Sequence, residues 1–160
     1  MRVQEIMTRH VATCRPDQSA NDAARIMWER DCGCVPVCDA DGDLVGIVTD
    51  RDLCMAAYLR SAPLREIEIE SVMSRVVQTC RPTDGIEDVE RRMATAQVRR
   101  IPIVGGVGQV IGIVSLSDIV RARARSVPSR LFERLVSDIA RTFAAITEPR
   151  PRVFSDTSTP

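Results

Sequence analysis

The sequence lacks several features on which common functional classes depend. It has no lysine and a single histidine, and its 22 arginines balance 22 acidic residues, so the formal net charge is zero. A neutral chain gives no overall electrostatic reason to expect a nucleic acid or a membrane surface as partner. No apolar run approaches the ~20 residues of a membrane span, and residues 1–5 lack the apolar core of a signal peptide. We therefore expect a cytoplasmic protein that binds neither membranes nor nucleic acid.

Recognisable catalytic chemistry is also missing. His10 lies at the start of an expected strand, without a partner that would make it part of a Cys–His or Ser–His pair. Residues 105–108 (GGVG) are glycine-rich, but they fall in an expected hairpin turn and not between a strand and a helix, where phosphate-binding loops lie. We expect a binding protein that is not an enzyme, has no catalytic residues and requires no cofactor.

The sequence does contain an internal repeat. Residues 46–52 (GIVTDRD) return 66 positions later as residues 112–118 (GIVSLSD), and the same spacing holds elsewhere without a gap. The other matching pairs are 13–16 with 79–82, 35–37 with 101–103, and Met27 with Met93. Self-similarity at a fixed period indicates one structural unit used twice. At 160 residues and 44% apolar content, the chain can bury a core as one domain or as two fused units.

Hydrophobic periodicity and turn residues predict the order β-α-β-β-α for each copy. The predicted elements are strands 11–14, 34–38 and 44–48 with helices 19–30 and 50–59 in copy one, and strands 76–80, 100–104 and 109–114 with helices 86–96 and 116 onward in copy two. We place repeat 1 at residues 1–62 and repeat 2 at residues 63–125.

Residues 126–160 lie outside the repeat. Pro128 is placed to start a helix that carries Leu131, Leu135, Ile139 and Phe143 on one face. Two interpretations stay open: the helix packs on this protein's own core or on a dimer partner, or it docks onto another protein. The polar, proline-containing residues 149–160 predict a disordered tail.

The repeated ending of each copy has the spacing of a helix cap. Thr49 stands three residues before Asp52, and Ser115 three residues before Asp118, as in a capping box. A second interpretation is a ligand site. Free N–H groups at a helix start favour phosphate, and an ionised carboxylate accepts hydrogen bonds from ribose hydroxyls. Spacing alone does not separate the two.

Six cysteines raise the question of a metal or redox site. Cys32, Cys34 and Cys38 do not have the C-x2-C spacing of structural zinc sites. Cys34 and Cys38 fall on one face of a strand, and Cys14 and Cys80 occupy equivalent repeat positions, which favours buried thiols that act as small hydrophobic residues. We expect reduced cysteines and no bound metal, with zinc binding or a thiol sensor as the alternative.

Taken in order, these motifs resemble the CBS-domain pair, or Bateman module, over about residues 1–125. The resemblance rests on the doubled β-α-β-β-α unit, on the Val-Pro-Val and Ile-Pro-Ile strands, and on the two G-h-h-[ST]-x-x-D endings. It implies an α/β fold of two repeats related by a pseudo-two-fold axis, here followed by a C-terminal helix. It also implies two clefts between the repeats that in many relatives bind adenosyl ligands.

The resemblance also assigns roles to residues. Asp52 and Asp118 would hold ribose hydroxyls, while Thr49 and Ser115 would contact ribose or phosphate. The adenine slots would be lined, mostly through backbone atoms, by Val35, Val37, Ile101 and Ile103. Relatives often carry basic residues where repeat 2 has Arg99 and Arg100, and these would serve chiefly the cleft of Thr49 and Asp52, with Arg100 the stronger candidate.

These considerations predict a stand-alone regulatory sensor. It would bind AMP, ADP, ATP, NAD or S-adenosylmethionine, form a homodimer through helix faces near Met27, Trp28 and Met93, and pass ligand occupancy to an unidentified protein partner. The rival hypothesis is a structural or interaction protein with empty clefts that acts through its C-terminal helix and the basic segment around it.

Overall fold

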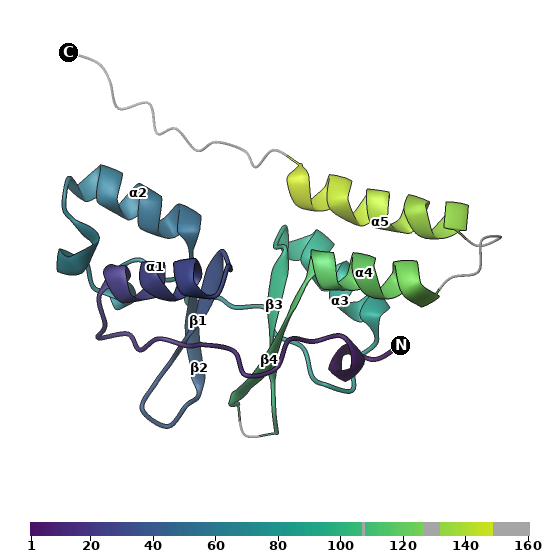
Figure 1. Ribbon diagram of the computed structural model, residues 1–160, viewed down its shortest axis with the longest axis horizontal. Coiled ribbons are helices and arrows are strands. Elements are labelled where there is room, and N and C mark those ends of the chain that lie inside the picture. The colour runs from purple at the N-terminus through teal and green to yellow at the C-terminus, as the bar shows by residue number, and fades with distance from the viewer. Residues whose placement is uncertain (107, 127–131, 149–160) are drawn as a thin grey trace, which may run out of the picture.

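Each repeat forms a β-hairpin with two helices packed on it (Figure 1). The computed structural model describes residues 1–106, 108–126 and 132–148. The elements of repeat 1 are α1 (Ala20–Glu29), β1 (Cys34–Cys38), β2 (Leu44–Thr49) and α2 (Asp50–Arg60). Those of repeat 2 are α3 (Ile86–Ala96), β3 (Arg100–Val104), β4 (Val110–Ser115) and α4 (Leu116–Ser126). Short 3-10 turns η1 (Val3–Glu5), η2 (Leu64–Glu66) and η3 (Ile69–Ser71) precede the repeats, and α5 (Phe132–Thr147) follows them. This confirms the predicted α/β fold of tandem repeats with a C-terminal helix.

Helix α1 shows how local sequence sets an element. Ser19 caps it: the Ser19 hydroxyl accepts from the Asp22 N–H, and the Asp22 carboxylate accepts from the Ser19 N–H. Ala20, Ala23 and Met27 then fall on one side of the helix and are buried. This confirms the predicted helix 19–30, although the observed helix begins one residue later and ends one residue earlier.

The expected first strand of each repeat is wrong. In place of strands 11–14 and 76–80, only Cys14 and Cys80 form single bridges, parallel to β1 and β3. The Cys14 N–H donates to the Pro36 carbonyl, and the Cys14 carbonyl accepts from the Cys38 N–H. The next donors on either side would be the nitrogens of Pro36 and Pro16, which carry no hydrogen, so the ladder stops after one residue. Pro102 and Pro82 have the same effect in repeat 2.

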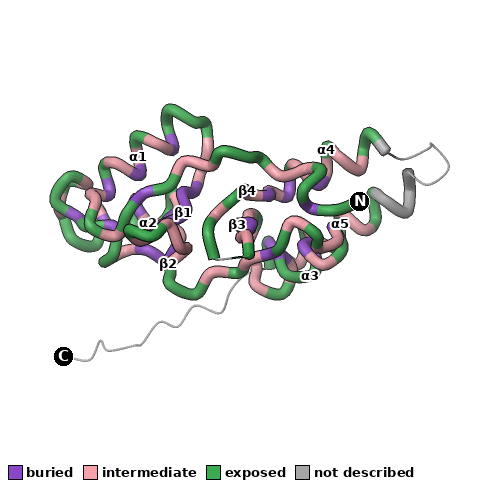
Figure 2. Tube along the Cα trace, turned by 90° about the horizontal axis from the view of Figure 1, so that it is seen from below, coloured by how far each residue is buried: buried purple, intermediate pink, exposed green. Residues whose placement is uncertain are grey.

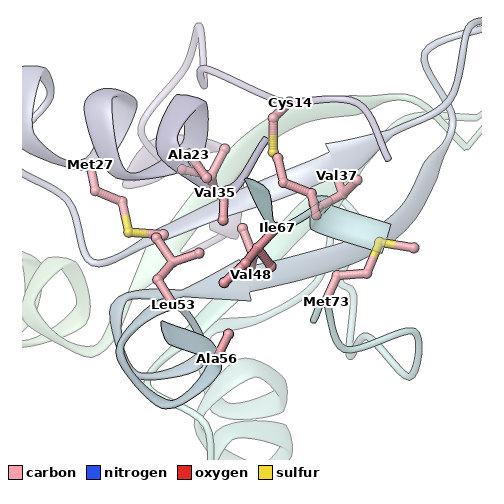
Figure 3. Packing of buried hydrophobic residues seen from close by; sticks show 12 residues of the cluster. Cys14, Ala23, Met27, Val35, Val37, Val48, Leu53, Ala56, Ile67 and Met73 are labelled. Atoms are coloured by element: carbon pink, nitrogen blue, oxygen red, sulfur yellow. The ribbon is translucent and has the colours of Figure 1, made fainter. Parts of the chain in front are cut away.

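Two separate cores form, and each includes residues from the lead-in segment of the other repeat. The linker residues Ile67 and Met73 are buried in the core of repeat 1 (Figure 3), and so is Ile69. Val3 is buried in the core of repeat 2. Ser74 pairs with β2, and Thr8 with β4, in matching antiparallel bridges. The lead-in of each repeat therefore packs on the other one. The boundary between residues 62 and 63 stays a prediction.

This exchange explains the glycine in each G-h-h-[ST]-x-x-D ending. A Cβ atom at Gly46 would lie 2.6 Å from Sδ of Met73 and 3.1 Å from the carbonyl oxygen of Ser74. At Gly112 it would lie 2.7 Å from Sδ of Met7 and 3.1 Å from the carbonyl oxygen of Thr8. Only a residue without a side chain lets the exchanged segment pair so closely with the strand.

Helix α5 lies across α3 and α4 of repeat 2 (Figures 1 and 2). Its Ile146 is buried in the core of that repeat, which confirms the interpretation of a helix packed on the protein's own core. The expected face is correct only in part, because Ile139 is half-buried whereas Phe143 is 52% exposed. The side of α5 toward the core contains Ile139, Thr142 and Ile146. Pro128, Leu131, the side chain of Leu135 and residues 149–160 lie outside the described residues.

Within the described ranges, no helix is both long and apolar enough to span a membrane.

Candidate functional site

The Thr49–Asp52 ending forms a complete capping box at the start of α2. Oδ2 of Asp52 accepts from the Thr49 N–H at 2.9 Å and from the Thr49 hydroxyl at 2.7 Å, and the Thr49 hydroxyl oxygen accepts from the Asp52 N–H at 3.3 Å. The capping role is therefore confirmed. Among the described residues no donor contacts Oδ1 of Asp52, so half of this partly buried carboxylate is available to a ligand.

The Ser115–Asp118 ending repeats the box at α4 with one difference. Oδ2 of Asp118 accepts from the Ser115 N–H at 2.8 Å and from its hydroxyl at 2.6 Å. Its other oxygen, Oδ1, accepts from Arg121 one turn later. Repeat 1 has Met55 at the position of Arg121. A ligand hydroxyl would have to displace a guanidinium from Asp118, whereas Oδ1 of Asp52 has no such competitor. Sequence spacing alone could have revealed this (i, i+3) pair.

Arg100 reaches from repeat 2 into repeat 1. Its backbone pairs with Ser115 in the β3–β4 hairpin, but its Nη2 lies 3.4 Å from where a Cβ of Gly33 would stand. Oδ2 of Asp50 lies 2.9 Å from that same point. Because Cys34, the residue after Gly33, pairs with Thr49, the guanidinium lies at the repeat-1 ending, the side anticipated for it.

The charge around Arg100 is mixed. No hydrogen bond or ion pair of its guanidinium occurs within the described part of the chain, so it can engage an anion. Asp50 lies nearby and would weaken that binding, and sequence reasoning missed it because its approach to Arg100 depends on the contact between repeats. Burial raises the pKa of the Cys34 thiol to about 11, although the nearby Arg100 acts in the opposite direction.

The remaining candidates lie in two different environments. Arg99 is exposed, and its carbonyl accepts from the Leu116 N–H at 2.9 Å. The four candidate strand residues have no exposed surface and face the two cores: Val35, Val37, Ile101 and Ile103. Only their backbone could contact a ligand, as the resemblance implied, and that contact stays a prediction.

The turns of the two hairpins meet at the far end of the contact between repeats. The Leu44 N–H donates to the Gly108 carbonyl at 3.4 Å, and Asp43 pairs with Gln109. The repeats thus touch at the hairpin turns and again at Gly33 and Arg100.

Two hollows lie against α4 and α2, the helices that follow the two endings. One, of about 340 Å³, is lined by Asp118 together with Met1, Glu5, Ile6, Arg121, Ala122 and Arg125. The other, of about 420 Å³, lies between α1 and α2.

Burial disfavours the thiolate form of the four buried cysteines. Burial raises the pKa of Cys14 to about 12, and it also raises the pKa values of Cys38 and Cys80. Across residues 1–106, 108–126 and 132–148, no group of three or more His, Cys, Asp or Glu side chains is arranged to hold a metal. The expectation of reduced, metal-free cysteines stays a prediction.

Comparison with curated proteins adds two kinds of relative. The chain is 34% identical over 117 residues to the CBS domain-containing protein YhcV of Bacillus subtilis. This match covers 73% of the present chain and 81% of YhcV. It is also 34% identical over 119 residues, or 74% of its length, to a homoserine O-acetyltransferase of Methanohalobium evestigatum. The match covers only 23% of that enzyme.

Solved structures of similar fold include ligand complexes. The CBS domain pair of MJ0100, in complex with 5′-methylthioadenosine and S-adenosyl-L-methionine, matches with a TM-score of 0.71 and 27% identity over 79% of this chain and 98% of that one. CBSX2 in complex with AMP matches with a TM-score of 0.67 and 26% identity, over 78% of this chain and 96% of that one. Hypoxic Response Protein I with two coordinated zinc ions matches with a TM-score of 0.69 and 26% identity, over 80% of this chain and 100% of that one.

The family model of the CBS domain matches residues 3–58 and 69–125, which are the two repeats seen in the structure. These segments make up most of the chain, and the protein therefore belongs to the CBS-domain family, as a tandem pair of CBS repeats.

Proposed function

We propose that this protein is a non-catalytic regulatory module that binds an adenine nucleotide or a related adenosyl ligand between its two repeats. The observation that carries the proposal is the grouping at the start of α2. There, Oδ1 of Asp52 is unengaged among the described residues, and the guanidinium of Arg100 arrives from the other repeat.

These groups match the chemistry of a nucleotide. A carboxylate oxygen accepts hydrogen bonds from a ribose diol. A guanidinium binds a phosphate through two N–H groups at once, and the N-terminus of the eleven-residue helix α2 favours negative charge. The relatives that bind AMP, S-adenosylmethionine or methylthioadenosine support this class of ligand.

The two half-sites differ in strength under this proposal. Arg121 already occupies the second oxygen of Asp118, and Gly33 and Cys34 offer no positive charge at the position of Arg99 and Arg100. We therefore assign the tighter binding to the half-site of Thr49, Asp52 and Arg100, with the half-site of Ser115 and Asp118 weaker.

The proposal extends to assembly and location. The module acts as a cytoplasmic homodimer and passes ligand occupancy to a protein partner. Met93 cannot contribute to the dimer face, because it has no exposed surface, and Met27 is 7% exposed, whereas Trp28 is 89% exposed. Of the three residues expected near the dimer face, Trp28 is therefore the one whose side chain is available for contact.

A thermal-shift panel of AMP, ADP, ATP, NAD and S-adenosylmethionine tests the ligand class. A ligand that binds only the folded protein at 100 times its Kd adds ~2.7 kcal/mol to the free energy of unfolding. We expect at least one adenosyl compound to raise the melting temperature, and inosine monophosphate at the same concentration to raise it less.

A second candidate function is an interaction module with empty clefts. It is favoured by the outer side of α5, where Val136 is 47% and Phe143 52% exposed. The panel separates the two candidates, because no shift with any adenosyl compound would favour the interaction module.

A further inference from the structure

Two of the six cysteines are not buried, and both line the same groove. Cys32 is half-buried and Cys54 is exposed, whereas the other four are buried. The groove lies between α1 and α2 and has a volume of about 420 Å³. Reactive thiols are found at partly exposed positions of this kind, whereas buried structural thiols are inert.

Backbone hydrogen bonds hold Cys32 beside the start of α2. Its N–H donates to the Met27 carbonyl at 3.0 Å, and Asp31 before it has a left-handed φ of 48°, which together end α1 in a Schellman-type turn. The carbonyl of the next residue, Gly33, accepts from the Asp50 N–H at 3.3 Å. Cys32 is therefore fixed next to the first turn of α2.

Cys54 lies one helical turn beyond Asp50. The groove is lined on this side by Asp50, Leu53, Cys54 and Ala57. Their spacing is that of a single helical face. Because Cβ atoms four residues apart in a helix lie about 5–6 Å from each other, Cys54 stands directly above Asp50. The two thiols thus lie at the same end of the groove.

Repeat 2 shows that these two positions belong together. Cys32 and Cys54 correspond to Val98 and Val120, each 66 positions later. Both valines pack against the core of repeat 2. The Val98 N–H donates to the Met93 carbonyl at 3.0 Å, the same helix ending as in repeat 1. A pair of positions that carries valine in repeat 2 therefore carries cysteine in repeat 1.

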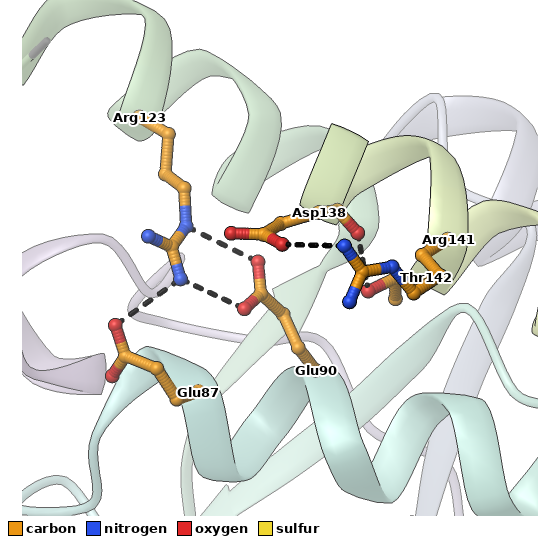
Figure 4. A network of polar contacts seen from close by, with 6 residues as sticks. All are labelled: Glu87, Glu90, Arg123, Asp138, Arg141 and Thr142. Carbon is orange, nitrogen blue, oxygen red and sulfur yellow. Dashed lines mark hydrogen bonds and ion pairs between the residues drawn. The ribbon is translucent and has the colours of Figure 1, made fainter. Parts of the chain in front are cut away.

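The groove of repeat 1 is also open to small solutes. Ala24 and Ala57, which line it, correspond to Glu90 and Arg123 in repeat 2. There Nη2 of Arg123 lies 2.7 Å from Oε2 of Glu90, and this ion pair links α4 to α3 beside α5 (Figure 4). The two alanines of repeat 1 leave that space empty, so a solute can reach the thiols.

We propose that Cys32 and Cys54 are a redox-active thiol pair, which a hydroperoxide oxidises to a disulfide. The sulfur of exposed Cys54 attacks one peroxide oxygen, the O–O bond breaks, and water or an alcohol leaves with the thiol proton. This gives a sulfenic acid on Cys54. The sulfur of Cys32 then attacks the sulfur of Cys54, the S–S bond forms, and the hydroxide leaves as water with the proton of Cys32. The two thiols lose two electrons, and one peroxide accepts them.

The disulfide ties the segment before β1 to α2, two residues beyond Asp52. Disulfides in a reducing compartment are usually transient and serve redox sensing, so the pair is reduced at rest and oxidised only under peroxide. This response needs no ligand at the repeat junction, and it stands or falls independently of nucleotide binding.

Peptide mapping after brief treatment of the reduced protein with hydrogen peroxide tests the pair. Free thiols are alkylated before digestion, and the digest is analysed by mass spectrometry without reduction. We expect one intramolecular disulfide, between Cys32 and Cys54, that dithiothreitol reverses.

Variants that restore the valines of repeat 2 test the two roles. Cys32→Val and Cys54→Val should each fold and lose the cross-link. In Cys32→Val the sulfenic acid on Cys54 has no second thiol to attack it, so dimedone should trap it there. Cys80→Ala removes a buried thiol from repeat 2 and is the matched control, which should keep the cross-link.

Three results would overturn the proposal. Dimedone could trap Cys54 in the wild-type protein to the same extent as in Cys32→Val, which would show that Cys32 does not reach it. The cross-link could join Cys54 of two copies. Both thiols could stay reduced under peroxide that oxidises the unfolded protein.

Discussion

Replacing Gly46 by alanine tests whether the exchange of lead-in segments holds each repeat together. The added methyl group would stand 2.6 Å from Sδ of Met73 and 3.1 Å from the Ser74 carbonyl oxygen. Met73 is 8% exposed and has little room to move. Overpacking a core costs ~1–3 kcal/mol. The reduced entropy of the unfolded chain returns ~0.4–1 kcal/mol, because the backbone of Gly46 is not left-handed.

The expected net loss is about 1–2 kcal/mol, or roughly 2–8 °C in melting temperature for a chain of this length. Urea unfolding and thermal melting followed by circular dichroism measure it. Gly106→Ala is the control, since nothing lies within 4 Å of a Cβ there, and it should melt at or above the wild-type temperature. Combining Gly46→Ala with Met73→Ala should cost less than the sum of the single changes. If Gly46→Ala were as stable as Gly106→Ala, the close pairing of Ser74 with β2 would be refuted.

Three further predictions concern titration, thiols and metal. Hydrogen bonds from Ser19 lower the pKa of Asp22 below its ordinary value of 3.8. The ionised Asp22 carboxylate therefore stabilises the folded protein fully above pH 3.8, and this stabilisation is lost as the pH falls through the folded-state pKa. Asp22→Asn should therefore narrow the difference in unfolding free energy between pH 6 and about pH 3, and an unchanged difference would contradict the capping geometry. With pKa values of about 12 and 11, Cys14 and Cys34 hold roughly a thousandth or less of their thiol as thiolate at about pH 8. Iodoacetamide should then label exposed Cys54 in the native protein and all six cysteines only after unfolding, while rapid native labelling of Cys34 would argue for a thiol sensor. Elemental analysis of protein purified without chelator should find no stoichiometric zinc, whereas one zinc per chain would overturn the packing role of the cysteines.

Local sequence signals predicted the repeated elements well. The bounds of β1, β3 and α3 agree with the predicted ranges 34–38, 100–104 and 86–96. Their patterns are local, since alternating or helical apolar periodicity is interrupted by turn residues on both sides. The expected strands 11–14 and 76–80 failed because prolines on two separate segments remove the donors of the ladder.

The exchange of lead-in segments could not be read from periodicity. Val3 and Ile69 occupy equivalent repeat positions, 66 residues apart, yet each is buried in the core of the other repeat, a choice set by long-range packing. Sequence reasoning likewise predicted only part of the candidate site. The capping geometry of Thr49 and Asp52 follows from spacing, whereas the approach of Asp50 to Arg100 depends on how the two repeats meet.

Isothermal titration of AMP, with adenosine as the ligand lacking phosphate, tests ligand binding at the repeat junction most directly. Asp52→Ala should remove the stronger binding event, and Asp118→Ala only the weaker one. Each variant loses one of two equivalent capping boxes, which costs ~1 kcal/mol of folding stability, so each variant controls for that cost in the other.

The decisive variant in the same titration is Arg100→Ala. It should weaken AMP about ten- to a hundredfold, the worth of one charge-assisted hydrogen bond, while changing adenosine little. Arg75→Ala, at an exposed arginine that pairs with Glu70, should change neither affinity. Equal losses of AMP and adenosine on Arg100→Ala, or loss of the stronger event on Asp118→Ala, would contradict a nucleotide site built from Asp52 of one repeat and Arg100 of the other.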